Sequence, residues 1–496
     1  MASSFTDLTV ASMDKMLAGN FKKTSPENSA PDCLIHAPYR DLRHDTHPVQ
    51  ASLRKVGQNR LSPRQSGRCS RLASGMRFCG TVMKYNFSEM RCHLRAGLPQ
   101  PGLVVLSLWL VLFAVPGRTK AEDRADYRYE DYREGDGRIH IQTHGAYFDV
   151  ALRPWLNVQG NYIYDSISGA TPTGAPSLNG EPDFATVTVA DIRRAGFLQA
   201  AIKAGNHTFT PQVSYSKESD YKSVGVSLGD AIEFNEKNTT LSIGVSHSFD
   251  QVLPNEGQGH WVGDQYSFSL ESEQDKNSTD VLLGVTQLLG PNDVFSAFLT
   301  LGYSSGFLDD PYKRVYFDGN GVDYYNPDPD PLFRYIVWPE RRPDTKFRQV
   351  LFLSYQHYFE KLNAGSELTY RLHHDDFGIT AHTASLQWNQ KLGKVFILSP
   401  LIRFHTQSAA DFYNTHFSGD PLDQGALPLP KYFSADYRLS ELDSLTYGVS
   451  LSAKVWKHLS LELAFKRYEM YGRDSITHPD QYPKANVVTL GATAWF

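Results

Sequence analysis

The segment LHHDDFG carries residue types that catalyse hydrolysis in many enzymes. An imidazole beside a carboxylate can activate water near neutral pH. Neighbouring residues of a strand point to opposite faces, so His373 could work only with Asp375. By the same rule, His374 could work only with Asp376. A solvated strand end explains these residues more simply, and an enzyme acting at the rim of a larger structure remains an alternative.

The segment GVSLG, Gly225 to Gly229, matches the G-x-S-x-G pattern of serine hydrolases. That chemistry requires Ser227 on a sharp turn between a strand and a helix. Val224, Val226 and Leu228 alternate through the segment and predict one continuous strand instead. We therefore interpret Ser227 as an ordinary residue of the polar face.

Hard oxygen ligands gather in and beside YYNPDPDPLF, which runs from Tyr324 to Phe333. Closely spaced carboxylates such as Asp323, Asp328 and Asp330 suit Ca²⁺. Their spacing differs from that of an EF-hand loop, and the intervening prolines hold the last two apart. Two interpretations stay open, a calcium site and an acidic loop stiffened by proline, and we expect no other cofactor.

Basic residues gather in ERRPDTKFR, Glu340 to Arg348, although the surrounding chain is acidic. The four bases are Arg341, Arg342, Lys346 and Arg348. They could form a pore constriction that selects anions, or bind the phosphates of lipopolysaccharide. The alternative is a charged loop base that pairs with neighbouring acids.

The elements that must position these residues are β-strands. After residue 122, apolar and polar residues alternate over ten or more positions, as in 239–249, 381–392 and 445–456. We find no convincing helical period there. Tight turns alternate with long polar loops, which is typical of a transmembrane β-barrel. The long loops are predicted at 169–191, 253–277, 314–346, 407–437 and 474–484.

The predicted fold is therefore all-β, a transmembrane antiparallel barrel. Seven tightly turned pairs fit between Arg138 and Arg473. The last strand, 485–496, must also find a partner, because a barrel cannot leave an edge in lipid, and 126–134 would supply it. This arrangement predicts sixteen strands, with fourteen also open. Sixteen strands enclose a lumen wide enough for water.

The last strand indicates where such a barrel resides. Val488 and Leu490 would face lipid, whereas Thr489 would face the interior. The terminal Phe496 fits an aromatic girdle and is similar to the signature by which the bacterial barrel-assembly machinery recognises its substrates. We expect a Gram-negative outer membrane, with its lipid, its lipopolysaccharide and the assembly machinery as partners. No nucleic acid is expected, and the oligomeric state stays open.

The composition divides the chain near residue 121. Before this point 17 Lys and Arg stand against 7 Asp and Glu, and after it 32 stand against 47. The apolar run from Leu103 to Val115 is too short to span a membrane and follows basic residues, which predicts a signal peptide at 90–121. Residues 1–89 are interpreted as an upstream extension that is spurious or has no fixed structure. The alternative is a genuine basic extension with an internal signal anchor. The barrel would occupy 122–496.

The segment YDSISGATPTGAP, Tyr164 to Pro176, closely resembles the D-x-ISGA-x-P motif of an uncharacterised bacterial domain-of-unknown-function family of predicted outer-membrane barrels. Further matching pieces include DIRRAG at 191–196 and HTFTPQVSYSKESDY at 207–221. The resemblance covers nearly all of 122–496. It implies the fold and compartment given above and brings no activity or substrate.

These observations favour a porin-like channel for small solutes or ions, without catalysis. Small polar residues on the inward rows suit a hydrated pore, and equally a lumen plugged by the loop 314–346. The acidic balance after residue 121 favours cations mildly. The alternatives are the enzyme at the rim and a structural or adhesive barrel that binds partners through its long loops.

Overall fold

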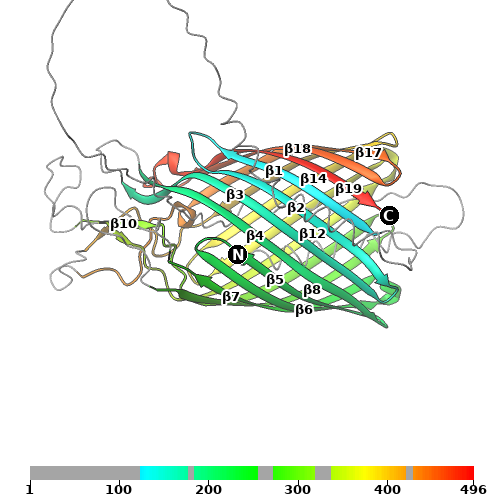
Figure 1. The fold of residues 1–496 in the computed structure, drawn as a ribbon, viewed down its shortest axis with the longest axis horizontal. Coiled ribbons are helices and arrows are strands. Elements are labelled where there is room, and N and C mark those ends of the chain that lie inside the picture. Colours follow the sequence, from blue (N-terminus) through cyan, green and yellow to red (C-terminus); the bar gives the residue numbers. More distant parts are fainter. Residues whose placement is uncertain (1–122, 177–183, 255–271, 319–336, 420–427) are drawn as a thin grey trace, which may run out of the picture. The chain divides into compact units, whose positions relative to one another are not determined.

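The computed structural model describes residues 123–176, 184–254, 272–318, 337–419 and 428–496. Within these residues, sixteen strands form a closed antiparallel barrel, and three short strands form a second sheet (Figure 1). The barrel strands are β1 (Arg124–Glu134), β2 (His140–Arg153), β3 (Leu156–Pro176), β4 (Phe184–Ala204), β5 (His207–Lys217), β6 (Tyr221–Phe234), β7 (Thr239–Val252), β8 (Gln274–Gly290), β9 (Asp293–Gly306), β12 (Thr345–Phe359), β13 (Ala364–Asp375), β14 (Thr380–Leu392), β15 (Phe396–Gln407), β17 (Leu442–Trp456), β18 (Leu459–Gly472) and β19 (Lys484–Trp495). None of the helices in the described part is long and apolar enough to cross a membrane.

The barrel closes between its first and last strands, as the sequence predicted. β1 pairs with β2 on one side and with β19 on the other, and Tyr129 lies opposite Leu490. The pairing continues beyond β19, because Phe496 N donates to Asp123 O at 3.0 Å and Asp123 N donates to Phe496 O at 3.1 Å. The all-β class and the count of sixteen strands, rather than fourteen, are therefore confirmed for the described residues.

The strands present an apolar outer face and a polar inner face. On β19, Val488 and Leu490 are 38% and 48% exposed, whereas Thr489 between them is 4% exposed. Glutamines opposite one another on β3, β4 and β5 form one inward row: Gln159, Gln199 and Gln212. This alternation is that of an outer-membrane barrel, whose outer band contacts lipid and whose lumen is polar.

Seven tight connections lie at one end of the barrel, the turn end. The long connections lie at the other, the loop end, together with the short links 134–140, 217–221 and 375–380. The tight connections are 153–156, 204–207, 234–239, 290–293, 359–364, 392–396 and 456–459. The predicted loop 169–191 is corrected, because β3 continues to Pro176 and β4 begins at Phe184. Val187 and Val189 alternate with threonines, and this β-branched pattern extends the hairpin beyond its neighbours.

The described parts of the two longest connections at the loop end pack together into one unit. We call its described parts, 307–318, 337–344, 408–419 and 428–441, the cap. It contains the second sheet, in which β10 (Arg314–Asp318) lies between β11 (Val337–Pro339) and β16 (His416–Ser418). The predicted loops 314–346 and 407–437 therefore contain strands. The apolar side chains of Val315, Phe317 and Phe433 explain this difference, since they are at most 2% exposed and form a core together with Ala175 of β3.

The cap packs against the inner face of the barrel at its loop end. Ala381 on β14 points inward and joins a cluster with Ala410 and Leu439 of the cap. A second contact lies on β3, where Gly174 has φ +96°. A Cβ atom at this glycine would come 2.6 Å from Ala435 O, so the cap backbone approaches there as closely as glycine allows.

Candidate functional site

An ion-pair network lies inside the cap, with Asp436 at its centre. Arg342 Nη2 donates to Asp436 Oδ2 at 2.8 Å, and Arg438 Nε donates to both carboxylate oxygens at 2.9 Å. Lys313 Nζ lies 3.6 Å from Oδ1. Asp436 is 1% exposed and Lys313 is 2% exposed. Because these charges are buried, each depends on its partners to offset the free energy of removing it from water.

Glu340 and Asp310 extend the network. Arg342 Nε lies 2.7 Å from Glu340 Oε1, and Ser434 donates its hydroxyl to Oε2 at 2.5 Å. The backbone amide of Asp310 donates to Glu340 Oε1 at 2.5 Å, and the Asp310 carboxylate accepts from Arg438 Nη2. Three acids and three bases from all parts of the cap except 408–419 thus share one network.

The surroundings of the two most buried acids give them different pKa values. Burial raises the pKa of Glu340 to about 7, although Arg342 opposes this change. Burial also acts to raise the pKa of Asp436, but the three surrounding cations hold that pKa well below its usual range. Asp436 is therefore the permanent negative charge of the network, and Glu340 is its titrating member.

We expect the cap to lose stability as the pH rises from about 4.5 to about 7. Between these pH values Glu340 stays protonated in the folded cap but is ionised in the unfolded cap. This difference stabilises the folded cap fully below about 4.5, and the stabilisation is lost above about 7. The change in the free energy of cap opening is at most about 3 kcal/mol.

Maleimide labelling of Ala410→Cys would measure cap opening, with all four native cysteines replaced by serine. Each rate is divided by that of an exposed Lys431→Cys at the same pH. Glu340→Gln should flatten the profile, and an unchanged profile would contradict this role.

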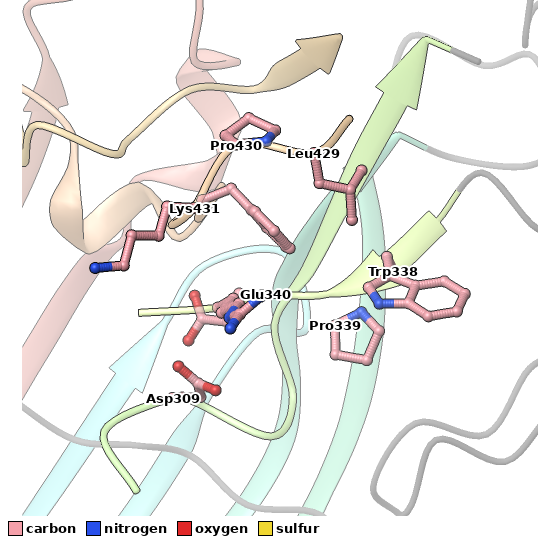
Figure 2. A pocket seen from close by; sticks show the side chains of 9 residues that line it. Asp309, Trp338, Pro339, Glu340, Leu429, Pro430 and Lys431 are labelled. Atoms are coloured by element: carbon pink, nitrogen blue, oxygen red, sulfur yellow. The ribbon is translucent and has the colours of Figure 1, made fainter. Parts of the chain in front are cut away.

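A pocket of about 430 Å³ opens beside the network (Figure 2). Trp338 and Phe433 give it apolar walls, and Arg341 and Lys431 bring positive charge to its lining. Asp309 and Glu340 lie on the side away from Trp338 in the figure. The pocket thus offers aromatic surface and cations to a small molecule.

The structure divides the four predicted basic residues between the cap, which contains Arg341 and Arg342, and barrel strand β12, which contains Lys346 and Arg348. Lys346 Nζ lies 2.7 Å from Asp375 Oδ2, and Arg348 Nη2 contacts both oxygens of Asp280 at 2.6 and 2.8 Å. Arg342 belongs to the network. Arg341 is exposed, and its side chain makes no ion pair with any residue in the described ranges. Only Arg341 therefore presents its charge without a carboxylate partner there.

His373 and Asp375 meet on the same side of β13, as strand geometry requires. His373 Nε2 lies 2.9 Å from Asp375 Oδ2. The other oxygen of Asp375 accepts the backbone amides of Phe377 and Ile379 at 3.1 and 3.2 Å. Together with the ion pair to Lys346, these contacts make Asp375 the organiser of a turn.

The remaining candidates from the sequence lie apart from the cap network. His374 Nδ1 contacts Thr380 Oγ1 at 2.9 Å. Ser227 lies in the middle of β6, opposite Gln212, and the prediction of a continuous strand at GVSLG is confirmed. The calcium candidates Asp323, Asp328 and Asp330 lie outside the described residues, as do 1–122.

Sequence reasoning missed Asp310, Asp436 and Arg438. Arg342 and Asp436 are 94 residues apart, and Arg438 and Asp310 are 128 apart. The one available signal is local: Asp436 lies in the predicted polar loop 407–437, and Arg438 stands two residues further on, just beyond it.

The sequence from residue 113 to residue 487 matches the model of a family described as "Protein of unknown function (DUF3570)". This chain belongs to that family. The match confirms the resemblance to a family of unknown function. No curated protein matches the sequence.

Solved structures that resemble this DUF3570 protein include a siderophore receptor and two proteins described as outer-membrane proteins. The siderophore receptor PirA from Pseudomonas aeruginosa is 9% identical with a TM-score of 0.35, over 76% of this chain and 63% of the receptor. A bacterial polysaccharide outer membrane secretin is 7% identical with a TM-score of 0.41, over 76% and 100% of the two chains. The outer membrane protein opdK from Pseudomonas aeruginosa is 9% identical with a TM-score of 0.35, over 76% and 98%. The hydrogen-bonded register of its sixteen strands defines the barrel fold of this protein within the described residues.

Proposed function

We propose that this DUF3570 protein is a bacterial outer-membrane channel for small solutes or ions whose mouth is narrowed by the cap. The observation that carries the proposal is the polar inner face of a closed sixteen-stranded barrel, within the described residues. A barrel of this size has room for water along its axis. Export through the signal peptide at 90–121 would deliver it to the outer membrane.

The cap gives the proposed channel its filter. Its core packs against inward-facing side chains such as Ala381, so solutes must pass along or through the cap to reach the lumen. Three of the predicted constriction residues pair with carboxylates. Arg342 does so inside the cap. Lys346 and Arg348 do so between barrel strands. Arg341 is left to act on passing ions, and it would favour anions.

Neutralising Arg341 should shift the channel towards cations. In a salt gradient across a planar bilayer, Arg341→Ala should move the reversal potential towards that of the more permeant cation, because a cation at the mouth repels other cations. Arg473→Ala is the matched control, since Arg473 is also exposed at the loop end and pairs with Glu441 at 3.2 Å. Equal shifts in both variants would show that Arg341 has no special place in the permeation path.

A further inference from the structure

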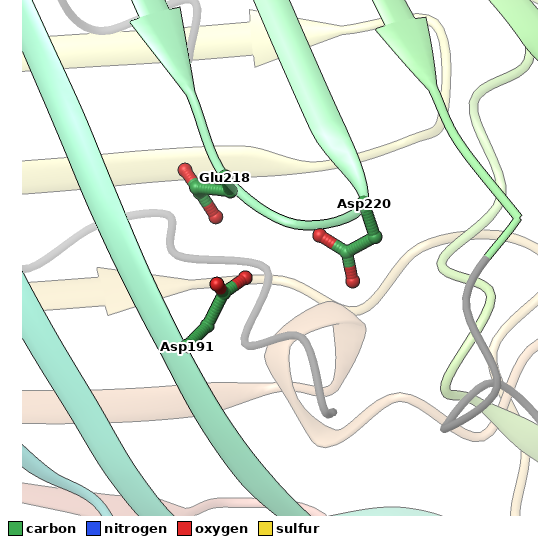
Figure 3. A group of neighbouring side chains, drawn as sticks. All are labelled: Asp191, Glu218 and Asp220. Carbon is green, nitrogen blue, oxygen red and sulfur yellow. The ribbon is translucent and has the colours of Figure 1, made fainter. Parts of the chain in front are cut away.

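Three carboxylates converge at the loop end, outside the cap network. Asp191 belongs to β4, and Glu218 and Asp220 belong to the turn between β5 and β6. Their nearest oxygens all lie within 4.8 Å of one another, and Figure 3 shows the three side chains around a common space. Asp220 is fully buried and Glu218 is 8% exposed.

Glu218 is the residue that points to a ligand. The residue is more than nine-tenths buried, yet its side chain makes no hydrogen bond or ion pair with any residue that the structure describes. Burial of an ionised carboxylate without a partner is costly. Arg193, the base with the largest electrostatic effect on Glu218, forms its ion pair with Asp165 at 2.9 Å. Burial accordingly raises the pKa of Glu218 to about 7.

We propose that Asp191, Glu218 and Asp220 bind one Ca²⁺ ion. Carboxylate oxygens are the ligands that this hard cation prefers, and its flexible coordination accepts three side chains from two segments, with water completing the shell. The hydrogen bonds that Asp191 and Asp220 already accept leave further lone pairs on their oxygens. A divalent ion would also neutralise the charge that Glu218 carries into the interior.

The proposed ion would strengthen the contact between the barrel wall and the cap. Tyr312, in the cap, donates its hydroxyl to Asp220 Oδ2 and is itself 2% exposed. On the other side, Ser219 donates its amide and hydroxyl to Asp191 Oδ2 at 3.2 and 2.9 Å. Calcium would thus fix β4, the β5–β6 turn and Tyr312 relative to one another.

Calcium titration of the purified full-length protein tests this site. After treatment with EDTA and dialysis in detergent, calorimetry with CaCl₂ should show one equivalent of binding, and Glu218→Gln should weaken the affinity at least about tenfold because one anionic ligand is lost. Glu441→Gln is the matched control, since it removes an exposed carboxylate at the same end, and it should bind as the wild type does. Saturable one-equivalent binding that Glu218→Gln leaves unchanged, or its absence from the wild type, would overturn the proposal.

Thermal unfolding separates a lost ligand from a damaged fold. In EDTA, Glu218→Gln and Asp191→Asn should melt at or above the temperature of the wild type, because each relieves repulsion between carboxylates. In CaCl₂ the order should reverse, since only the wild type gains the stabilisation of a bound ion. Calcium that raises the melting temperature of all three proteins equally would exclude this site.

Discussion

Asp436→Asn should release the cap while the barrel stays closed. The variant leaves Arg342, Arg438 and Lys313 without their shared negative charge, and Lys313 is only 2% exposed. Removal of one member of a buried ion pair costs about 3–5 kcal/mol. Because each 1.4 kcal/mol is tenfold, labelling of Ala410→Cys should become about 100-fold faster or more.

The barrel itself supplies the internal standard for this result. Its strands are joined by their own hydrogen bonds, so heat-modifiable migration on gels should stay that of a folded barrel. Glu441→Gln removes an exposed carboxylate whose pair with Arg473 contributes at most about 1 kcal/mol, and its labelling rate should change little. Similar labelling rates in the two variants would mean that the network does not hold the cap.

Excision of the cap should open the barrel without unfolding it. β9 and β12 already pair Ser305 with Thr345, and β15 and β17 pair Gln407 with Leu442. Residues 307–344 and 408–441 can therefore each be replaced by an Asn-Gly turn that joins neighbouring antiparallel strands. Liposomes containing this variant should swell in sugar solutions roughly tenfold faster than liposomes with the wild type, since a barrel of this size then encloses an open water-filled lumen.

Two observations would contradict the role of the cap in this second prediction. One is a variant that keeps the gel mobility of a folded barrel but causes no faster swelling, which would place the barrier elsewhere in the lumen. The other is a wild type that already swells at the rate of the excised variant, which would mean that the cap does not narrow the mouth.

The barrel could be predicted from the sequence because its pattern is local. Each strand alternates apolar residues that face lipid with polar residues that face the lumen. The orientation of Val488, Thr489 and Leu490 can therefore be predicted from these three residues alone. A closed antiparallel barrel of this kind has an even number of strands and leaves no strand edge unpaired in lipid, so the last strand required a partner. The length of the β3–β4 hairpin escaped prediction, because its residues beyond Gly169 are rich in glycine, proline and threonine as loops are.

The cap could not be predicted, because its contacts join residues that are far apart in sequence. Arg342 was a candidate by its charge, but nothing near it indicates Asp436, which is 94 residues away. Asp191 on β4 and Glu218 in the β5–β6 turn are likewise separated in sequence, and their approach follows from the register of β4 and β5. Alternation in the sequence predicts which face of the barrel a residue occupies. The residue that it contacts across the loop end depends on the path of the long loops, which the alternation does not predict.

Conductance of the purified wild-type protein in a planar bilayer tests the central claim most directly. The account predicts discrete current steps in the wild type and larger steps in the barrel without residues 307–344 and 408–441. A wild type and an excised barrel that both stay electrically silent, while gel mobility shows that both are folded, would contradict the proposal that this protein is a channel.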